Sequence, residues 1–429
     1  KLGLPIGPER TFTGDPNDAV QNNFAMVLDY DNYLTDSYFG INTVDVVENT
    51  TRFNATYAHY FTQRSSLNAG ASFYLRAMDN NYLQQRVDGA KPTECWCFDD
   101  ESMLIEPGLF AEYTYQIEEK FSLVVGLRGD YSKINGDYYY DGANKGQILI
   151  TPRSHIRWSI TPRTTLRASA GMGYRRQNLV TDNIWMMTTS RDIKVNDPEY
   201  GFAKLNDDME AAATFGGSLS QTFRLAGDDQ ATISVDYFRT QFFNTMVFDQ
   251  ETDDNTILIY NSKGKSFTDN YQIEFNWTPF RGFDLFATFR YTNAKMTVER
   301  DDKSYLVERP LTSRFKGLIN IQYAVRRWVF DVTAQLNGPM RLPELNGDMV
   351  AAVENPTLSP IYPMFFAQVS YKVSNLTIYL GCENIGNYKQ PKPIVVPEGG
   401  PYAPGFNSSM VWGPLTGVKG YVGIRLNIY

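Results

Sequence analysis

The sequence lacks any long hydrophobic run. No stretch approaches the roughly 20 apolar residues that a membrane-spanning helix requires, and the mean hydropathy of the 429 residues is −0.37. A helical membrane protein is therefore excluded. Strands that cross a membrane as a barrel are not excluded, because their apolar and polar residues alternate and cancel in a hydropathy average.

Cysteine, histidine and positive charge are also scarce. Three cysteines are too few for a fold built on disulfides, and a net charge of −8 without a basic stripe argues against nucleic acid as a partner. The chain has two histidines and contains no glycine-rich phosphate loop, HExxH sequence or nucleophile elbow. We therefore expect neither an enzyme nor a bound cofactor.

Aromatic residues are abundant, with 28 Tyr and 27 Phe, and they fall in segments that alternate in polarity. In Phe121–Tyr131 (FSLVVGLRGDY), one set of alternate residues is apolar, whereas the other carries Arg128 and Asp130. The same two-residue period recurs around residues 166–174, 231–237, 328–336, 376–383 and 422–428. This period predicts β-strands with one apolar and one polar face.

The connections between these strands alternate between short and long. Many strands reach 11–16 residues, well beyond the roughly 5–6 residues of soluble strands. This length and the loop asymmetry predict an all-β fold, a transmembrane antiparallel β-barrel with short periplasmic turns and long extracellular loops. A large soluble β-sandwich or propeller is the alternative, but no repeat of about 40–50 residues supports a propeller. The expected short links lie near residues 118–120, 161–163, 227–229, 279–282, 325–327 and 373–375, and the expected long loops near residues 79–102, 175–206, 250–265, 299–310, 339–360 and 384–416.

Several segments resemble the barrel of TonB-dependent outer-membrane receptors, particularly those of the Bacteroidetes. They are Glu106–Ser132, Thr151–Asn178, Val235–Asp249, Tyr260–Phe275, Tyr379–Ile394 and the closing stretch Ser409–Tyr429. The closing stretch departs from the family pattern, because Ile428, and not the terminal Tyr429, falls on the lipid-facing register. The resemblance implies a barrel of 22 strands, of which we expect about 15–17 in this chain.

The resemblance also implies a domain organisation and partners. Residues 49–429 correspond to the C-terminal part of such a barrel, and residues 1–48 are an unassigned segment with room for one strand and a loop. We expect the plug domain that fills the barrel to lie outside this chain, together with the peptide that contacts TonB. The implied location is the outer membrane of a Gram-negative bacterium, with lipid against the barrel.

Charged side chains on the lumen-facing register suggest a substrate site at the wall. Such a cationic strip would attract an anionic substrate; alternatively, it pairs with the plug or with barrel carboxylates such as Asp130. Trp185, in the loop that follows, would add an aromatic contact or pack the loop. The members of the strip are Arg153, His155 and Arg157 on one predicted strand and Arg175 and Arg176 at the outer end of the next.

A cysteine-containing segment, Glu94–Asp100 (ECWCFDD), suggests a site for a soft metal ion such as Cu(I) or Zn²⁺. Two thiols are fewer than the three or four ligands of a usual metal site, so a disulfide or two free thiols are the alternatives. Cys382 shares the lipid-facing register of Leu380 and is predicted to be a small hydrophobe. The candidate ligands are Cys95, Cys97, Asp99, Met186 and Met187.

Together these features predict a TonB-dependent importer of a scarce solute. The cysteine segment favours a metal or a metal complex, such as a ferric siderophore, haem, cobalamin, copper or zinc. The alternatives are a passive porin or adhesin barrel, and an importer of oligosaccharide or peptide with a surface lipoprotein as partner.

Overall fold

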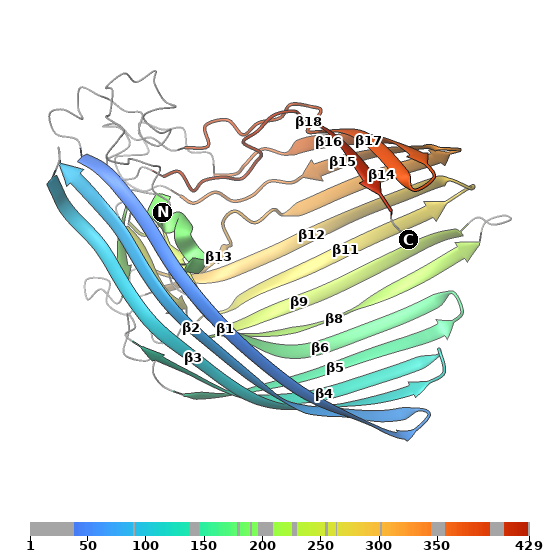
Figure 1. Cartoon of the computed structure of the whole chain (residues 1–429), viewed down its shortest axis with the longest axis horizontal. Coiled ribbons are helices and arrows are strands. Elements are labelled where there is room, and N and C mark those ends of the chain that lie inside the picture. Colours follow the sequence, from blue (N-terminus) through green and yellow to red (C-terminus); the bar gives the residue numbers. More distant parts are fainter. Residues whose placement is uncertain are drawn as a thin grey trace.

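The fold is one curved antiparallel sheet. The structure, a computed structural model, describes residues 38–88, 91–136, 146–177, 181–188, 191–195, 209–224, 230–253, 256–262, 264–300, 303–344, 357–394 and 407–427. Figure 1 shows the strands side by side in a tilted wall that curves around a hollow. Within these residues, no helix has both the length and the apolar character needed to cross a membrane.

Fifteen long strands form the wall, and each pairs antiparallel with the next one. This arrangement confirms the predicted antiparallel all-β architecture. The strands are β1 (Tyr38–Thr62), β2 (Ser65–Asp88), β3 (Lys91–Ile117), β4 (Phe121–Gly136), β5 (Gln147–Thr161), β6 (Thr164–Arg176), β8 (Met209–Arg224), β9 (Gln230–Asp249), β11 (Ser266–Thr278), β12 (Phe283–Arg300), β14 (Phe315–Val325), β15 (Trp328–Asn337), β16 (Tyr362–Val373), β17 (Leu376–Glu383) and β18 (Lys419–Leu426).

Four short elements lie in the long connections. They are the 3-10 helix η2 (Thr181–Thr188) and the strands β7 (Asp192–Val195), β10 (Thr256–Ser262) and β13 (Lys303–Glu308). β10 pairs with β9 and, in parallel, with β7, whereas β13 pairs with the end of β12. The long loops therefore carry their own folded structure.

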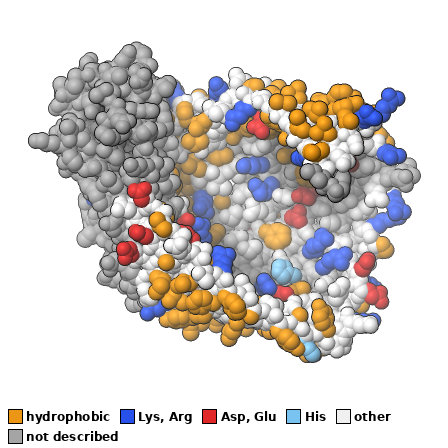
Figure 2. Space-filling view, viewed as in Figure 1, with side chains coloured by type: hydrophobic (Ala, Val, Ile, Leu, Met, Phe, Trp, Pro, Cys, Tyr) orange, Lys and Arg blue, Asp and Glu red, His pale blue; other side chains and the backbone are white. Residues whose placement is uncertain are grey.

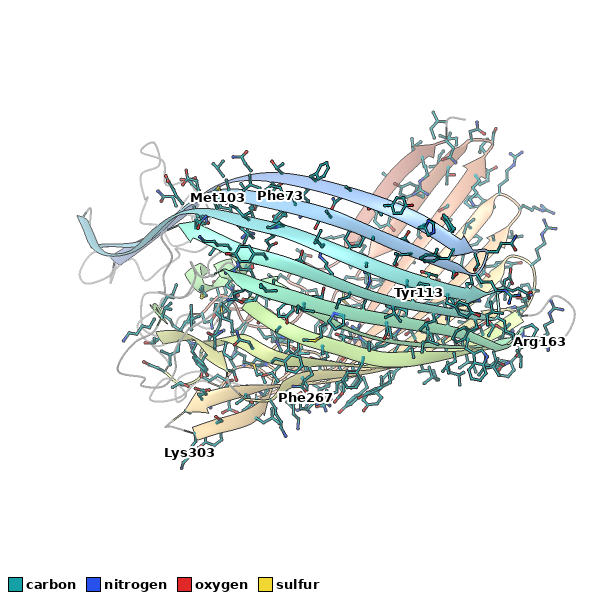
Figure 3. All side chains as sticks on the ribbon, turned by 90° about the horizontal axis from the view of Figure 1, so that it is seen from below. Phe73, Met103, Tyr113, Arg163, Phe267 and Lys303 are labelled. Carbon is teal, nitrogen blue, oxygen red and sulfur yellow. The ribbon has the colours of Figure 1, made fainter. Side chains whose placement is uncertain are left out.

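The two faces of the wall differ as the sequence alternation predicts. On β4, Val125 and Leu127 are 47% and 56% exposed on the outer side. On the inner side of the same strand, Arg128 forms an ion pair with Asp130. Figure 3 shows Phe73 and Tyr113 projecting from the outside of β2 and β3. Apolar side chains so exposed are stable only against lipid, which the transmembrane assignment supplies.

The short connections gather at one end of the wall and the long ones at the other. In Figure 3, Arg163, in the β5–β6 turn, and Lys303, at the β12–β13 tip, lie at opposite ends. Several tight turns use left-handed backbone, including Glu118 (φ 47°) and Gly282 (φ 87°). The predicted short links are confirmed, except for the one near residues 227–229, which lies outside the described residues.

The predicted long loop at residues 79–102 is wrong. β2 continues to Asp88 and β3 begins at Lys91, so only two residues separate the strands. The backbone of this segment therefore forms strand although its sequence is polar. The dipeptide Asp88–Gly89 is a common hairpin-turn signal that predicts this outcome.

One glycine is required where two strands approach closely. A Cβ at Gly216 would overlap the carbonyl oxygen of Tyr237 and lie 2.7 Å from the Cα of Phe238. We therefore expect Gly216→Val to destabilise the wall by about 1–3 kcal/mol, because the backbone of β9 must shift. The matched control is Gly129→Val, since a Cβ at Gly129 meets nothing within 4 Å.

The measurement for this pair is the fraction of folded, heat-modifiable protein on gels after refolding in detergent, followed by unfolding in urea. Gly129→Val should match the wild type. Equal stability of the two variants would contradict the close-approach argument.

Candidate functional site

The predicted cationic strip lines two adjoining cavities on the lumen side of the wall. The first, the His155 cavity, has a volume of about 540 Å³ and lies over β5, β6, β8 and β9. Its lining includes Arg153, His155 and Arg175 together with Glu210 and Phe242. Alternation along β5 directs Arg153 and His155 to the same side, so the predicted grouping of these two residues is reproduced in the fold.

The second, the Arg76 cavity, has a volume of about 650 Å³ and lies over β2–β6. Four arginines line it, namely Arg76, Arg128, Arg153 and Arg176, with the carboxylates Glu106 and Asp130. Figure 2 shows Lys and Arg side chains gathered inside the hollow. Arg153 lines both cavities, so the two share one wall.

A break in the sheet makes this arrangement possible. The β5–β6 ladder ends at the pair Arg153–Gly171, directly beside Pro152. Proline has no backbone N–H to donate to a ladder. Beyond this point β6 leaves β5 while it remains paired with β8 up to Arg176.

The break changes the direction of the side chains at the end of β6. Lower on the strand, Leu166 belongs to the outward register and is 36% exposed. Further along the same register, Tyr174 and Arg176 line the Arg76 cavity. Arg175, between them, lines the His155 cavity. Arg175 and Arg176 are adjacent in sequence but therefore line different cavities.

Carboxylates of the wall partly neutralise the strip. Arg153 forms an ion pair with Glu112 at 2.5 Å, and both side chains lie within reach of water. Asp130, the partner expected for the strip, instead accepts two hydrogen bonds from Arg128. The wall therefore supplies some of the ion pairing that is the alternative to substrate binding by the strip.

Arg157 lies apart from the two cavities. Its Nη1 donates a hydrogen bond of 3.1 Å to the carbonyl oxygen of Glu119 in the β3–β4 turn. Arg167 is its direct neighbour across the β5–β6 pair. Arg157 therefore lies at the short-turn end of the wall, and its predicted role in substrate binding stays a prediction.

Trp185 lies at the opposite end, in a third cavity beneath the long loops. This Trp185 cavity has a volume of about 440 Å³, and its lining includes Phe242, Phe248, Lys295 and Arg309. The rings of Trp185 and Phe248 meet edge to face at 6.3 Å. Phe242 lines both this cavity and the His155 cavity. The alternation of residues along β9 does not predict this connection, because it gives only the side of the strand on which Phe242 lies.

Five long loops contribute residues around the Trp185 cavity, and we call this assembly the cap. They are the connections β6–β8, β9–β11, β12–β14, β15–β16 and β17–β18. At its centre, Glu251 accepts hydrogen bonds from Arg341 at 2.7 and 3.0 Å and from Arg300 at 2.8 Å. The amide of Glu344 donates to the same carboxylate at 2.8 Å. Residue 250 extends the network, because its carbonyl oxygen accepts from Arg191.

The neighbours of Glu251 stabilise the ionised form of its carboxyl group. Burial alone would raise the pKa of this carboxyl group, since only 4% of the residue is exposed. The hydrogen bonds from Arg341 and from the amide of Glu344, with the charges of Arg341 and Arg300, outweigh burial and lower the pKa below its ordinary value. The carboxylate is therefore ionised at neutral pH and holds the loops together.

An apolar core supports the cap. Val247, Leu258, Tyr260 and Val298 are almost completely buried and pack against one another. The hydroxyl of Tyr260 donates to Asp249 at 3.2 Å and accepts from the amide of Glu299 at 3.0 Å. The cap is thus preformed, in the sense that its loops already contact one another.

Of the predicted metal ligands, only Met186 has a described side chain, so the predicted metal site stays a prediction. Met186 is completely buried, as expected for a packing residue. The backbone of β3 contains Cys95, Cys97 and Asp99, but their side chains, like that of Met187, lie outside the described residues. In the part of the chain that the structure describes, no group of three or more His, Cys, Asp or Glu residues could hold a metal ion.

Comparison with known proteins identifies relatives of the wall. A family model described as "TonB dependent receptor-like, beta-barrel" matches residues 8–385. No curated protein matches the sequence.

Similar solved structures include a copper transporter, OprC, with 14% identity and a TM-score of 0.62 over 90% of this chain and 57% of that chain. The siderophore receptor PiuA from Acinetobacter baumannii has 14% identity and a TM-score of 0.57 over 90% and 56%. The ferric citrate transporter FecA has 12% identity and a TM-score of 0.54 over 90% and 55%. This chain spans little more than half the length of each.

Proposed function

Because the chain belongs to the TonB-dependent receptor family, as its β-barrel, we propose that it forms the wall of an active importer. Receptors of this family are transporters, not enzymes, and they lie in the outer membrane of Gram-negative bacteria. The solute would enter beneath the cap and pass along the cationic wall. The plug domain and TonB would be the partners that couple passage to energy.

The observation that supports this proposal is the succession of cavities along one side of the lumen. Phe242 joins the Trp185 cavity to the His155 cavity, and Arg153 joins the His155 cavity to the Arg76 cavity. The succession begins below the long loops and continues sideways across the strands of the wall. Most of its charged lining residues are arginines, so it favours an anionic solute.

We propose a metal complex with an anionic chelator as the solute class. The arginine-rich lining suits carboxylate or phenolate groups, which arginine binds with paired N–H donors. The similar structures named for copper, siderophore and ferric citrate transport support this class. Import of an oligosaccharide or peptide with a surface lipoprotein stays a second prediction.

Energy dependence tests the importer proposal. The intact protein is expressed in cells with and without TonB, and uptake of iron and copper chelates is measured before and after collapse of the proton gradient. We expect uptake to require both TonB and the gradient. Uptake that persists without them would favour the passive porin.

Neutralising the strip tests the role of the wall. We expect the triple change Arg153→Gln, Arg175→Gln and Arg176→Gln to weaken binding of an anionic iron chelate about tenfold, or about 1.4 kcal/mol, because attraction in the cavities is lost. The measurement is titration of the purified receptor. Arg157→Gln, on the same strand but away from the cavities, is the matched control, and an equal loss in that variant would contradict the assignment.

A further inference from the structure

A row of hydrogen-bond donors crosses the lumen face of the wall at the long-loop end, where β14 begins and β15 ends. Its side chains belong to neighbouring strands, and each residue is the direct cross-strand partner of the next. Each position alternates with the outward residues of its strand, so the side chains face the lumen. The members of this donor row, in strand order, are Gln272, Arg290, Lys316, Asn337 and Tyr362.

The first and last members of the donor row already have acceptors. Nε2 of Gln272 donates to the carboxylate of Glu274 at 2.7 Å. The hydroxyl of Tyr362 donates to the carbonyl oxygen of Trp412 at 3.2 Å. The uncommitted donors of the row are therefore found among its three middle members.

Two of these middle members, Arg290 and Lys316, place positive charges side by side. Both residues are exposed, and neither forms an ion pair within the described part of the chain. Asp331, a carboxylate on the same face, accepts hydrogen bonds of 3.1 and 3.2 Å from the neutral amide of Asn320. Like charges directly opposite one another in a sheet are destabilising, so the pair would be stabilised by an anion that the described wall does not supply.

The third middle member, Asn337, adds a buried donor beside Lys316. Only 3% of Asn337 is exposed, and its Oδ1 accepts from Nε2 of Gln335 at 2.9 Å. Its Nδ2 has no hydrogen-bond partner in the described structure. A buried donor without an acceptor has lost its hydrogen bonds to water and is costly. An oxygen atom of a ligand at Lys316 would supply the missing acceptor.

We propose that Arg290, Lys316 and Asn337 form a binding site for carboxylate groups on the lumen face. The guanidinium binds two oxygens with paired N–H donors, the ammonium adds charge, and the amide donates to a further oxygen. Neighbouring strands lie about 4.8 Å apart, so a small dicarboxylate can contact both cations. The carboxylate can come from the transported solute or from the plug domain. The site rests on the proposed function, because solute and plug enter the lumen only in an importer.

The first test follows unfolding of the intact receptor in urea, in detergent, with malonate as the probe. A ligand that binds only the folded protein raises the unfolding midpoint. We expect malonate to raise the midpoint of the wild type, and its uncharged diester, dimethyl malonate, to have no effect. The double change Arg290→Gln and Lys316→Gln should weaken malonate binding about tenfold, because both charge-assisted contacts are lost.

Two further variants separate the site from a general effect of charge. The double change Arg281→Gln and Arg326→Gln is the matched control, because it removes two exposed positive charges from the β11–β12 and β14–β15 turns at the opposite end of the wall. This control should behave as the wild type. Asn337→Asp places a carboxylate beside Lys316 with little change in shape, and it should reproduce the loss because the row then holds its own anion.

The second test detects a carboxylate of the plug, and it measures the ion conductance of the intact receptor in planar bilayers. If the plug supplies the anion, malonate leaves the wild type unchanged. The double change Arg290→Gln and Lys316→Gln then loosens the plug and raises the conductance, whereas the change of Arg281 and Arg326 does not.

Three results would overturn the proposal. The first is that Arg290→Gln with Lys316→Gln equals the wild type in both tests. The second is that the control at Arg281 and Arg326 loses as much, and the third is that Asn337→Asp keeps both the malonate response and the conductance of the wild type. Neither test needs transport, so failure of the importer proposal, seen as uptake without TonB, is a separate result.

Discussion

Glu251→Ala should open the cap while the wall remains folded. The change leaves the guanidinium groups of Arg300 and Arg341 and the amide of Glu344 without their shared acceptor. Removing one partner from a buried ion pair costs about 3–5 kcal/mol, because the remaining charges stay desolvated. Both arginine side chains are at most 25% exposed, so water compensates little.

Hydrogen exchange measures this effect directly. Amides of residues 256–262 and 341–344 should exchange much faster in the variant, whereas those in the membrane-spanning part of β9 should not change. Glu344→Ala is the matched control, since the side chain of Glu344 is 54% exposed and its carboxylate oxygen lies 3.8 Å from Arg341, beyond hydrogen-bonding distance. It should change stability by at most about 1 kcal/mol. Equal exchange in Glu251→Ala and wild type would show that the cap does not depend on this carboxylate.

The same carboxylate makes cap stability depend on pH in a defined direction. The pKa of Glu251 is lower in the folded cap than in an unfolded loop. Its stabilising contribution is therefore complete above the ordinary glutamate pKa of about 4.3, and is lost as the pH falls through the lowered folded-state value. Hydrogen exchange of the cap should accelerate in that acidic range, and this pH-dependent component should be absent in Glu251→Gln.

Asn384→Ala should lower the stability of the loop between β17 and β18. Asn384 is 4% exposed and has left-handed backbone with φ 50°. Its amide donates to the carbonyl oxygens of Tyr388 and Thr416 at 2.8 and 3.1 Å, and its oxygen accepts from the amide of Tyr388 at 3.0 Å. Losing three hydrogen bonds and placing alanine in left-handed backbone should cost about 3–5 kcal/mol.

A glycine variant separates the two contributions. Asn384→Gly loses the hydrogen bonds but tolerates the left-handed backbone, so it should be less destabilised than Asn384→Ala by about 1 kcal/mol. The measurement is urea unfolding together with exchange at Tyr388, whose ring stacks on Tyr362 at 4.6 Å. If both variants equalled the wild type, the loop would be held by its aromatic packing alone.

Alternation by itself determined the architecture of the wall. A period of two places apolar side chains on one face, and lipid on that face makes the exposed rows of Val, Leu and Ile stable. The turn residues then predicted which connections are short. The same rule placed Arg153 and His155 on one side of β5, and the structure keeps them together in one cavity.

The polarity of the sequence gave a wrong prediction at the ends of the strands β2 and β3, beyond the membrane. Residues 79–102 are polar, yet β2 and β3 continue through them with only two residues between. In water both faces of a hairpin carry polar side chains, so alternation disappears while backbone pairing persists. Polarity alone therefore does not distinguish a loop from a protruding strand.

The tertiary structure alone decided which residues meet across the lumen and in the cap. The break beside Pro152 sends Arg175 and Arg176 into different cavities, although their adjacency in sequence suggests one site. Glu251 and Arg341 are 90 residues apart, and no local pattern links them. Sequence periodicity specifies the direction of a side chain relative to its own strand, whereas curvature of the sheet and folding of the loops bring distant strands together.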